Sequence, residues 1–268
     1  MILKRPYRLR PIHRKMAFET FERTIPWRAG WKREYYGGSA HVRPSYATCV
    51  FEHELGARVE IPSVEIRPVR PEDRPELLDS FLDAFRYAPD YCGYPMVAYR
   101  KAARDYFEGF FGGNRGEWCP NASCVALHGD RIAAAVLVKI RGDGPLLDCL
   151  YSRPDRFRKG LATAAATFGV NRLVAAGHRT LKSCASLANE PSNAWHARFG
   201  FVELPNWMTA QSRYFNALRE LERRKNWGSI TPGEEAAAAV EIRTFEREYD
   251  RITAIEEIDF KKAMPLLD

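Results

Sequence analysis

The chain of 268 residues has no long hydrophobic run and no repeated cysteine spacing. Because no stretch approaches the roughly 18 consecutive apolar residues of a membrane-spanning helix, we expect no such helix. The first ten residues, MILKRPYRLR, carry charges where a secretion signal needs an apolar run, so we expect no signal of that kind. The six cysteines form no CxxC pair, which argues against a metal site or a disulfide framework and favours reduced thiols in the cytoplasm.

Hydrophobic residues make up 46% of the chain, which is enough for a sizeable core. The net charge of +7 is concentrated in residues 1–35, which hold ten lysines and arginines and three glutamates, while the remainder is close to neutral. Two interpretations of this basic leader stay open. We favour a solvated surface segment that lies on the domain, and the alternative is an arm that binds nucleic acid or an acidic partner.

The residue pattern predicts a mixed α+β fold. Strands are expected over residues 33–42 (a hairpin around Gly37-Gly38), 47–53, 57–62, 65–69, 122–130, 131–144, 145–154, 179–188 and 201–207. Helices are expected over residues 70–85, 96–111, 160–177, 189–200, 208–226 and from 232 toward 258, the last one begun by a capping box at Thr231 and Glu234. The three strands over 122–154 form an antiparallel meander in this interpretation.

We therefore divide the chain into three segments. Residues 1–63 form a basic, β-rich N-terminal extension, and residues 64–210 form a domain with a mostly antiparallel sheet flanked by helices. Residues 211–268 form a helical C-terminal extension. The tail helices either cover the sheet or join two copies of the chain in a homodimer, and the sequence does not choose between these roles.

The segment RPDRFRKGLATAAATFG, residues 153–169, changes character at Gly160. Basic residues precede this glycine, and small or apolar helix formers follow it. A helix N-terminus carries unpaired backbone N–H groups and a partial positive charge, so phosphates bind there readily. The segment therefore favours a phosphate or pyrophosphate site, and the alternative is a basic strand–helix turn at the surface.

Two common phosphate motifs are absent from the chain. The P-loop pattern GxxxxGK[ST] does not occur. A dinucleotide-binding GxGxxG would open a helix early in a βαβ unit, whereas here one glycine follows strands that look antiparallel. The sequence thus favours neither a P-loop nucleotide hydrolase nor a Rossmann-type enzyme.

The segment instead resembles the first motif of the GNAT N-acetyltransferase superfamily. That motif consists of a strand, a proline and then Arg/Gln-x-x-Gly-x-Gly/Ala at a helix start, where it grips the pyrophosphate of acetyl-CoA. Here Pro154 lies six residues before Gly160, and Gly160-Leu161-Ala162 matches Gly-x-Ala. The position of the Arg/Gln is taken by Phe157, so that its flanking arginines are left to supply the charge.

A second GNAT motif follows further along the chain. The family pattern is Asn-x-x-Ala/Ser-x-x-x-Tyr-x-x-x-Gly-Phe, and this chain has Asn189, Ser192, His196 and Gly200-Phe201 at those spacings. The departure is His196, which stands where the family has a tyrosine that protonates the departing CoA thiolate. The two motifs occur in the family's order, with a predicted helix and a predicted strand between them.

The resemblance implies an acyltransferase with acetyl-CoA as co-substrate and no metal. In the family an amine attacks the thioester carbonyl directly, without a covalent enzyme intermediate. Backbone N–H groups on the strand at residues 149–152 would bind the pantetheine arm and the thioester oxygen. The residues expected to contact acetyl-CoA are Leu150, Ser152, Arg158, Lys159, Gly160, Leu161, Ala162, Thr163, Asn189 and Ser192.

Three residues are candidates for proton transfer. The incoming ammonium must lose a proton, and Asp148 is our candidate base. His196 is the candidate acid for the thiolate, or a base itself, and Tyr151 is a second candidate acid. The alternative for His196 is a helix histidine packed beside Trp195, and the alternative for Asp148 and Tyr151 is an ordinary position on a sheet face.

The resemblance places the acceptor at the first two helices and their loop, residues 85–111, which are rich in aromatic residues that suit a cationic amine. Whether that amine belongs to a small molecule or to a peptide is not readable from the sequence. We therefore predict a cytoplasmic N-acetyltransferase. The alternative function is a non-catalytic acyl-CoA-binding module whose basic leader, residues 1–35, docks protein or nucleic acid.

Overall fold

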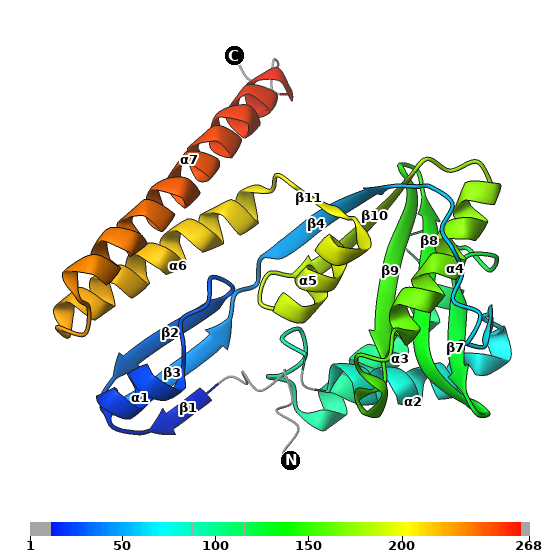
Figure 1. The fold of residues 1–268 in the computed structure, drawn as a ribbon, viewed down its shortest axis with the longest axis horizontal. Helices are drawn as coiled ribbons and strands as arrows, with labels where there is room; N and C mark the ends of the chain where they lie inside the picture. Colours follow the sequence, from blue (N-terminus) through cyan, green and yellow to red (C-terminus); the bar gives the residue numbers. More distant parts are fainter. Residues whose placement is uncertain (1–11, 87, 115, 264–268) are drawn as a thin grey trace. The chain divides into compact units, whose positions relative to one another are not determined.

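The computed structural model describes residues 12–86, 88–114 and 116–263, which divide into two compact units (Figure 1). The first, called here the sheet unit, contains residues 51–184 and 194–203. The second, called here the helical unit, contains residues 12–50, 185–193 and 204–263. The three-segment division expected from the sequence stays a prediction.

The larger sheet has eight strands in the order β11-β4-β10-β9-β8-β7-β5, with β6 paired to β8 outside that path. In chain order the strands are β4 (Thr48–Glu54), β5 (Ile66–Pro68), β6 (Glu117–Trp118), β7 (Cys124–His128), β8 (Arg131–Arg141), β9 (Gly144–Ser152), β10 (Thr180–Ser186) and β11 (Val202–Leu204). β7, β8 and β9 form the antiparallel meander that the sequence predicts, whereas β10 runs parallel to β9. The expected mixed, mostly antiparallel fold is thus confirmed.

Four helices belong wholly or partly to the sheet unit: α2 (Arg74–Phe85), α3 (Met96–Phe111), α4 (Leu161–Ala175) and α5 (Glu190–Phe199). Short 3-10 turns, η1 (Pro71–Asp73) and η2 (Pro154–Arg156), lead toward α2 and α4. In α3 the buried residues recur every three or four positions, which gives one apolar stripe: Tyr99, Ala103, Phe107 and Phe110. The helices expected over 70–85, 96–111, 160–177 and 189–200 are therefore confirmed within a few residues.

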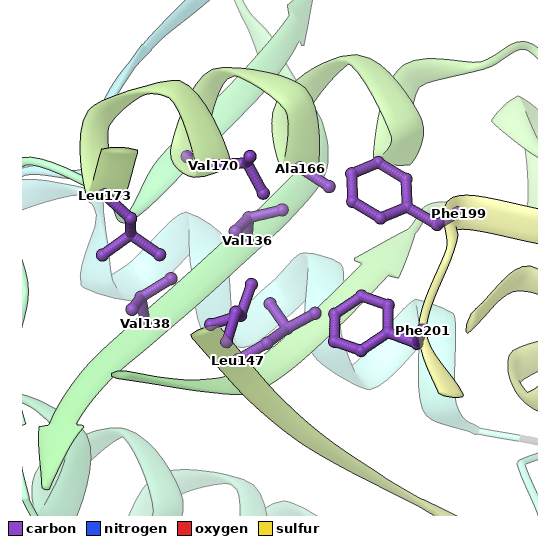
Figure 2. A pocket seen from close by; sticks show the side chains of 10 residues that line it. Val136, Val138, Leu147, Ala166, Val170, Leu173, Phe199 and Phe201 are labelled. Carbon is purple, nitrogen blue, oxygen red and sulfur yellow. The ribbon is translucent and has the colours of Figure 1, made fainter. Parts of the chain in front are cut away.

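Alternate residues of β8 and β9 face opposite sides of the sheet. Leu137, Cys149 and Tyr151 join the core formed with α2 and α3. Val136 and Leu147 face the other way and line a small apolar pocket together with residues of α4 (Figure 2). Helices thus cover both faces of these central strands.

The helical unit contains a second sheet, made of β1 (Ile12–Lys15), β2 (Trp31–Tyr36) and β3 (Ser39–Pro44). Its order is β1-β3-β2 and both pairings are antiparallel. Gly37 and Gly38 connect β2 to β3 with φ angles of 58° and 69°, a left-handed conformation that favours glycine. The hairpin predicted from these two glycines is confirmed.

Three helices complete the helical unit: α1 (Phe18–Thr24), α6 (Trp207–Asn226) and α7 (Pro232–Ala263). The hydroxyl of Thr231 accepts the backbone N–H of Glu234 (3.3 Å), and the Glu234 carboxylate accepts the backbone N–H of Thr231 (2.9 Å). This is the capping box that the sequence predicts at the start of the last helix.

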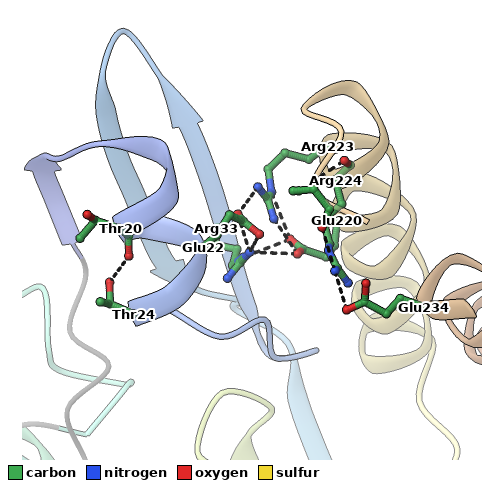
Figure 3. A network of polar contacts seen from close by, with 9 residues as sticks. Thr20, Glu22, Thr24, Arg33, Glu220, Arg223, Arg224 and Glu234 are labelled. Carbon is green, nitrogen blue, oxygen red and sulfur yellow. Dashed lines mark hydrogen bonds and ion pairs between the residues drawn. The ribbon is translucent and has the colours of Figure 1, made fainter. Parts of the chain in front are cut away.

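A buried ion network joins the leader to α6 (Figure 3). The Arg33 guanidinium donates to Glu22 (2.8 and 2.9 Å) and to Glu220 (3.2 Å). Arg223 donates to both carboxylates as well, with 2.7 Å to Glu220. Only 4% of the Arg33 side chain is exposed, so this part of the leader is a packed element and not a free arm.

Two expectations about the first third of the chain were wrong or incomplete. No strand forms over residues 57–62, because the backbone N–H and C=O of Arg58 bond the Asn171 side chain (2.8 and 2.9 Å) in place of a neighbouring strand. The elements β1 and α1 within the leader were not foreseen. The first eleven residues of the leader lie outside the described residues.

Among the described residues, no helix has the length and apolar character needed to span a membrane. All six cysteines lie within this part of the chain, and none of them forms a disulfide.

Candidate active site

A β-bulge at Asp148 interrupts the pairing of β9 with β8. Val138 pairs with Leu147 and Leu137 pairs with Cys149, so Asp148 is an extra residue in β9. Such a residue bends its strand and increases the local twist. The parallel pairing of β9 with β10 covers Leu146 and Leu147 and ends at this bulge. The sheet therefore opens between β9 and β10 where the sequence analysis expects the thioester.

The Asp148 carboxylate faces α3. Tyr106 donates a hydrogen bond to it (2.8 Å), and the Lys139 ammonium lies 3.8 Å away. Lys139 also donates to the Asn114 carbonyl (2.8 Å) and lies 5.4 Å from the centroid of the Phe110 ring. The Asp148 side chain is 14% exposed, so it is held by neighbours and still reached by solvent.

Several titratable groups lie in electrostatic contact with Asp148. Burial raises the pKa of the Cys184 thiol, and the carboxylates of Asp148 and Asp90 raise it further. Burial likewise raises the pKa of the Cys149 thiol well above its ordinary value, with Asp148 adding to the effect. The pKa of Asp90 is raised because the surrounding chain removes water from it, although the residue still reaches solvent. Two carboxylates and two protonated thiols thus surround the opening of the sheet.

Tyr106 carries a hydroxyl that stays protonated over the physiological range. Burial raises its pKa well above the ordinary value, and nearby Cys149 and Asp148 raise it further. A phenol that remains protonated donates to Asp148 and does not compete with it for a proton. This residue lies in the aromatic segment assigned to the acceptor, but its contact with Asp148 was not foreseen.

His196 lies on α5 within the sheet unit and is buried, with 3% of its surface exposed. Its Nε2 is 2.8 Å from the Ser183 hydroxyl on β10, and its ring stacks on Phe51 at 4.5 Å. Trp195 is also close, with the two ring centroids 5.1 Å apart. These contacts agree with the alternative that His196 is a helix histidine packed beside Trp195. Its contact with Ser183 places it next to the part of β10 that pairs with β9.

Tyr151 belongs to the core between the sheet and α2. It is 5% exposed, and its hydroxyl bonds the Ser80 hydroxyl (2.9 Å) and the Leu77 carbonyl (3.1 Å). These contacts favour the sheet-face alternative over the acid role. Leu150 and Ser152, the expected acetyl-CoA contacts of this strand, alternate with Tyr151 and so face the α4 side of the sheet.

The loop before α4 contains two residues in the left-handed conformation, Arg158 and Gly160. Gly160 is the N-cap of α4 with a φ of 76°, and no atom lies within 4 Å of the Cβ that another residue would carry there. Arg158 has a φ of 64°, which is strained for a residue with a side chain. Arg158, Lys159 and Gly160 are exposed, whereas Leu161, Ala162 and Thr163 are half-buried in the first turn of the helix. The charged side chains are therefore free of the core at a helix start that offers N–H groups.

Thr163 is tied to α5, since its hydroxyl accepts a hydrogen bond from Nε1 of Trp195 (3.1 Å). Asn189 and Ser192 belong to the helical unit, where Oδ1 of Asn189 accepts the backbone N–H of Ser192 (3.3 Å). That segment is held within its own unit by Trp31, whose Nε1 donates to the Ala188 carbonyl (3.1 Å). Leu150 and Ser152 of β9 thus face the α4 side of the sheet, and residues 158–163 form the loop before α4 and its first turn. Asp148 and Tyr151 lie on the opposite side, toward α3 and α2.

Two residues near the site were missed from the sequence. Lys139 is the one charged residue in the apolar run IAAAVLVKI, and such an interruption is the signal that points to a functional or paired charge. Arg153 ends β9, is 6% exposed and bonds Asp83 (2.5 Å) and Asp79 (3.0 Å) on α2. Arg153 thereby anchors the strand immediately before the basic loop.

The described residues contain no group of three or more His, Cys, Asp or Glu side chains placed to hold a metal ion. The apolar pocket of Figure 2 lies on the α4 side of the sheet and is lined by Val136, Val138, Leu147, Ala166, Gly169, Val170, Leu173, Leu181, Phe199 and Phe201. Since it offers no polar side chain, it is a feature of core packing and not a reaction site.

A comparison with curated proteins finds no match. Among solved structures, a GCN5-related N-acetyltransferase from Sphaerobacter thermophilus is 13% identical with a TM-score of 0.43, over 59% of this chain and 48% of that one. A paia N-acetyltransferase from Thermoplasma acidophilum in complex with coenzyme A is 15% identical with a TM-score of 0.45, over 54% and 92%. The chain thus spans about half the length of the first of these structures.

A family model gives the most specific result. Residues 77–201 match the model described as the acetyltransferase (GNAT) family. The matched range begins in α2 and ends just after α5, so it contains the bulge at Asp148, the loop at Gly160 and both sequence motifs. The resemblance drawn from the sequence is therefore confirmed over residues 77–201, which match the model of the GNAT acetyltransferase family.

Proposed function

We propose that this protein transfers an acetyl group from acetyl-CoA to an amine by direct attack on the thioester. The observation that carries the proposal is the bulge at Asp148, where β9 leaves β10 inside the segment matched by the family model. An opening of this kind gives a thioester access to backbone N–H groups at the sheet edge. The acceptor amine approaches from the side of α3.

The pyrophosphate of acetyl-CoA is assigned to the loop before α4. In this proposal the backbone N–H groups of residues 158–163 bind it at the start of α4, where the helix dipole favours negative charge. The exposed side chains of Arg158 and Lys159 add two positive charges beside Gly160. Open space around the missing Cβ of Gly160 lets a phosphate approach the backbone closely.

The proton balance of the reaction requires a base and an acid. The amine arrives as an ammonium, loses a proton to Asp148, and its nitrogen then forms the bond to the thioester carbonyl carbon. The C–S bond breaks as the tetrahedral intermediate collapses, and the CoA thiolate takes a proton from His196. The nitrogen, which is still positively charged after the attack, gives its second proton to His196 and so restores that residue. The hydrogen bond from Tyr106 orients the Asp148 carboxylate for the first of these steps.

The acceptor is proposed to be a cationic amine. Asp90 and Asp148 both lie in electrostatic contact with Cys184, so two carboxylates serve the same opening. Aromatic rings from α3 and the segment before it surround them, with Tyr91 and Tyr106 both packed against Phe81. Carboxylates and aromatic faces are the groups that bind an ammonium.

A second function is favoured by two departures from the family pattern. Phe157 replaces the Arg/Gln of the pyrophosphate motif, and His196 replaces the tyrosine. His196 also has its Nε2 beside Ser183, which turns that nitrogen toward β10. These features favour a module that binds acyl-CoA without transferring the acyl group.

Two measurements in sequence distinguish these functions. Calorimetry with acetyl-CoA and with CoA tests binding, and absence of heat at millimolar ligand would refute both functions. A thiol-release assay across small amines and peptide N-termini then tests transfer. Release that depends on the acceptor and falls in Asp148→Asn supports the enzyme, whereas binding without release for every acceptor supports the module. The basic leader's docking of nucleic acid and the homodimer stay predictions.

A further inference from the structure

Two histidines of the helical unit face each other across neighbouring strands. His13 on β1 and His41 on β3 are directly paired in the antiparallel register, so their side chains lie on one face of the three-stranded sheet. Their Nδ1 atoms are 2.9 Å apart, and their rings meet edge to face with centroids 4.3 Å apart. Without a cation, one ring can donate a hydrogen bond to the other at this distance.

The spacing of these nitrogens fits two neighbouring ligands of one cation. Imidazole nitrogens bind first-row metals at about 2.0–2.1 Å, so two of them at a right angle around a square-planar centre lie about 2.9 Å apart. In a tetrahedral site the same bonds separate them by about 3.3 Å. The distance of 2.9 Å between His13 and His41 therefore corresponds to square-planar geometry, which Cu(II) and Ni(II) prefer.

The surroundings of the pair supply a further oxygen. The Tyr36 ring stacks on the His41 ring at 3.8 Å with an angle of 3° between the planes, and its hydroxyl is 3.2 Å from Nδ1 of His41. Glu34 on β2 is the residue directly opposite His41 on its other side. His13 is exposed, so water reaches the pair and completes the coordination.

The charges near the pair select the type of cation. Lys15 and Arg43, each two residues along its strand, share this face of the sheet. Hard cations such as Ca²⁺ and Mg²⁺ need several oxygen ligands, and Glu34 and Tyr36 offer too few beside these two positive charges. The described residues hold no group of three His, Cys, Asp or Glu side chains placed around one ion, so the cation must bind two imidazoles strongly. Cu(II) has the highest affinity of the divalent first-row metals for nitrogen sites.

We propose that His13 and His41 form a chelate site for a divalent transition-metal cation, with Cu(II) as its preferred occupant. The site is separate from acetyl transfer, because both residues lie in the helical unit and outside residues 77–201. A bound cation would tie β1 to β3. β1 is an edge strand of four residues, so this bridge would strengthen the outermost pairing of the sheet.

The test uses the full chain without an affinity tag and one equivalent of Cu(II) at pH 7.5, with glycine as a weak competing chelator. The variants His13→Phe and His41→Phe keep a ring on the sheet and remove its nitrogens. The control His128→Phe removes an exposed histidine at the end of β7. The amino terminus and the remaining histidines are common to all four proteins, so their copper binding cancels in the comparison.

The parent and the control should each retain one more Cu(II) per chain than either strand variant. Electron paramagnetic resonance of the parent should show coupling to two imidazole nitrogens, and this signal should be lost in both strand variants. Circular dichroism establishes that all four proteins are folded. Equal copper retention in all four, or an unchanged two-nitrogen signal in a folded His13→Phe or His41→Phe, would overturn the proposal.

Discussion

Tyr106 and Asp148 are joined by a 2.8 Å hydrogen bond that connects α3 to the bulge of β9. This contact holds the proposed base in one orientation. Asp148→Asn removes the base and should lower kcat by about 10²- to 10⁴-fold, the range of general base catalysis. Tyr106→Phe removes only the orienting bond, so it should cost less than Asp148→Asn.

Thiol release at saturating acetyl-CoA measures both effects, and Tyr94→Phe is the matched control because Tyr94 is exposed in the same aromatic segment. An Asp148→Asn protein that keeps the parent kcat would show that another group accepts the proton.

Gly160 should be essential for CoA binding. Gly160→Glu brings bulk and negative charge to the helix start, so CoA binding should be abolished while the fold persists. The control is Gly177→Glu, which lies beyond the other end of α4 with a similar φ of 84° and equally open space. Both variants carry the same backbone strain, and calorimetry with CoA separates them. Parent-like binding by the folded Gly160→Glu protein would place the pyrophosphate elsewhere.

We expect Arg158 to strengthen CoA binding and to lower the stability of the fold. Its φ of 64° is tolerated well only by glycine. Arg158→Gly and Arg158→Ala should both weaken CoA binding by about 1.5–3 kcal/mol, or roughly ten- to a hundred-fold. The glycine variant should be the more stable of the two by about 1 kcal/mol, because it relieves the left-handed strain. Calorimetry tests the expected loss of CoA binding, and urea unfolding tests the expected difference in stability. Equal stability of both variants would argue against strain at this position.

Glu220 should be critical for the helical unit. It accepts hydrogen bonds from Arg33 and Arg223 while only 10% of its side chain is exposed. Glu220→Gln leaves two guanidinium groups with less compensating charge, and such a loss in a buried network costs about 3–5 kcal/mol. Glu235→Gln breaks an exposed ion pair with Lys225 and should cost less than about 1 kcal/mol. Similar unfolding midpoints for the two variants in urea would show that the ion network contributes little to the stability of the helical unit.

Stability should depend on pH through Asp73. Burial raises the pKa of Asp73, but hydrogen bonds from the Arg67 side chain and the Arg70 backbone outweigh it and bring the pKa below its ordinary value of 3.8. A carboxyl with a lowered pKa stabilises the fold above pH 3.8, and this contribution is lost as the pH falls through the folded-state value. Arg67→Met should therefore cost about 1–2 kcal/mol at pH 7 and progressively less below pH 3.8.

Urea unfolding of both proteins at pH 7, 5 and 3 tests this expectation. Arg74→Met, which breaks an exposed ion pair with Glu108, is the control and should show no such trend. A cost of Arg67→Met that stays constant over this range would contradict it.

The elements that the sequence predicts best are those with a strong local pattern. The stripe of Tyr99, Ala103 and Phe107 fixes α3, and the pair Gly37-Gly38 fixes the hairpin. The failure over residues 57–62 has a different origin. Its alternating residues suit a strand, but the only groups that bond the Arg58 backbone come from the Asn171 side chain, more than a hundred positions away. No local pattern reports a contact of that kind.

The residues of the candidate site, like the elements of the fold, were predicted only in part from the sequence. The spacing of Gly160 predicts a helix start, and the structure has Gly160 as the N-cap of α4, while its contact with a phosphate stays a prediction. The orientation of Tyr151 depends instead on the register of β9, which the bulge shifts by one residue. A sequence shows which residues lie on a strand but not where an extra residue enters it. Hence Tyr151 was predicted as an acid, while the structure places its hydroxyl against Leu77 and Ser80.

The bulge at Asp148 makes the number of residues in β9 as important as their identity. If Asp148 were deleted, Leu147 and Cys149 would become consecutive, and because they already face opposite sides of the sheet, β9 would pair with β8 in regular alternation. The bend and extra twist of the bulge, and with them the end of the pairing between β9 and β10, would be lost. Substitutions at this position change a single side chain, whereas a deletion removes the bulge itself. We therefore expect related chains to vary in the residue found here far more often than in the length of this strand.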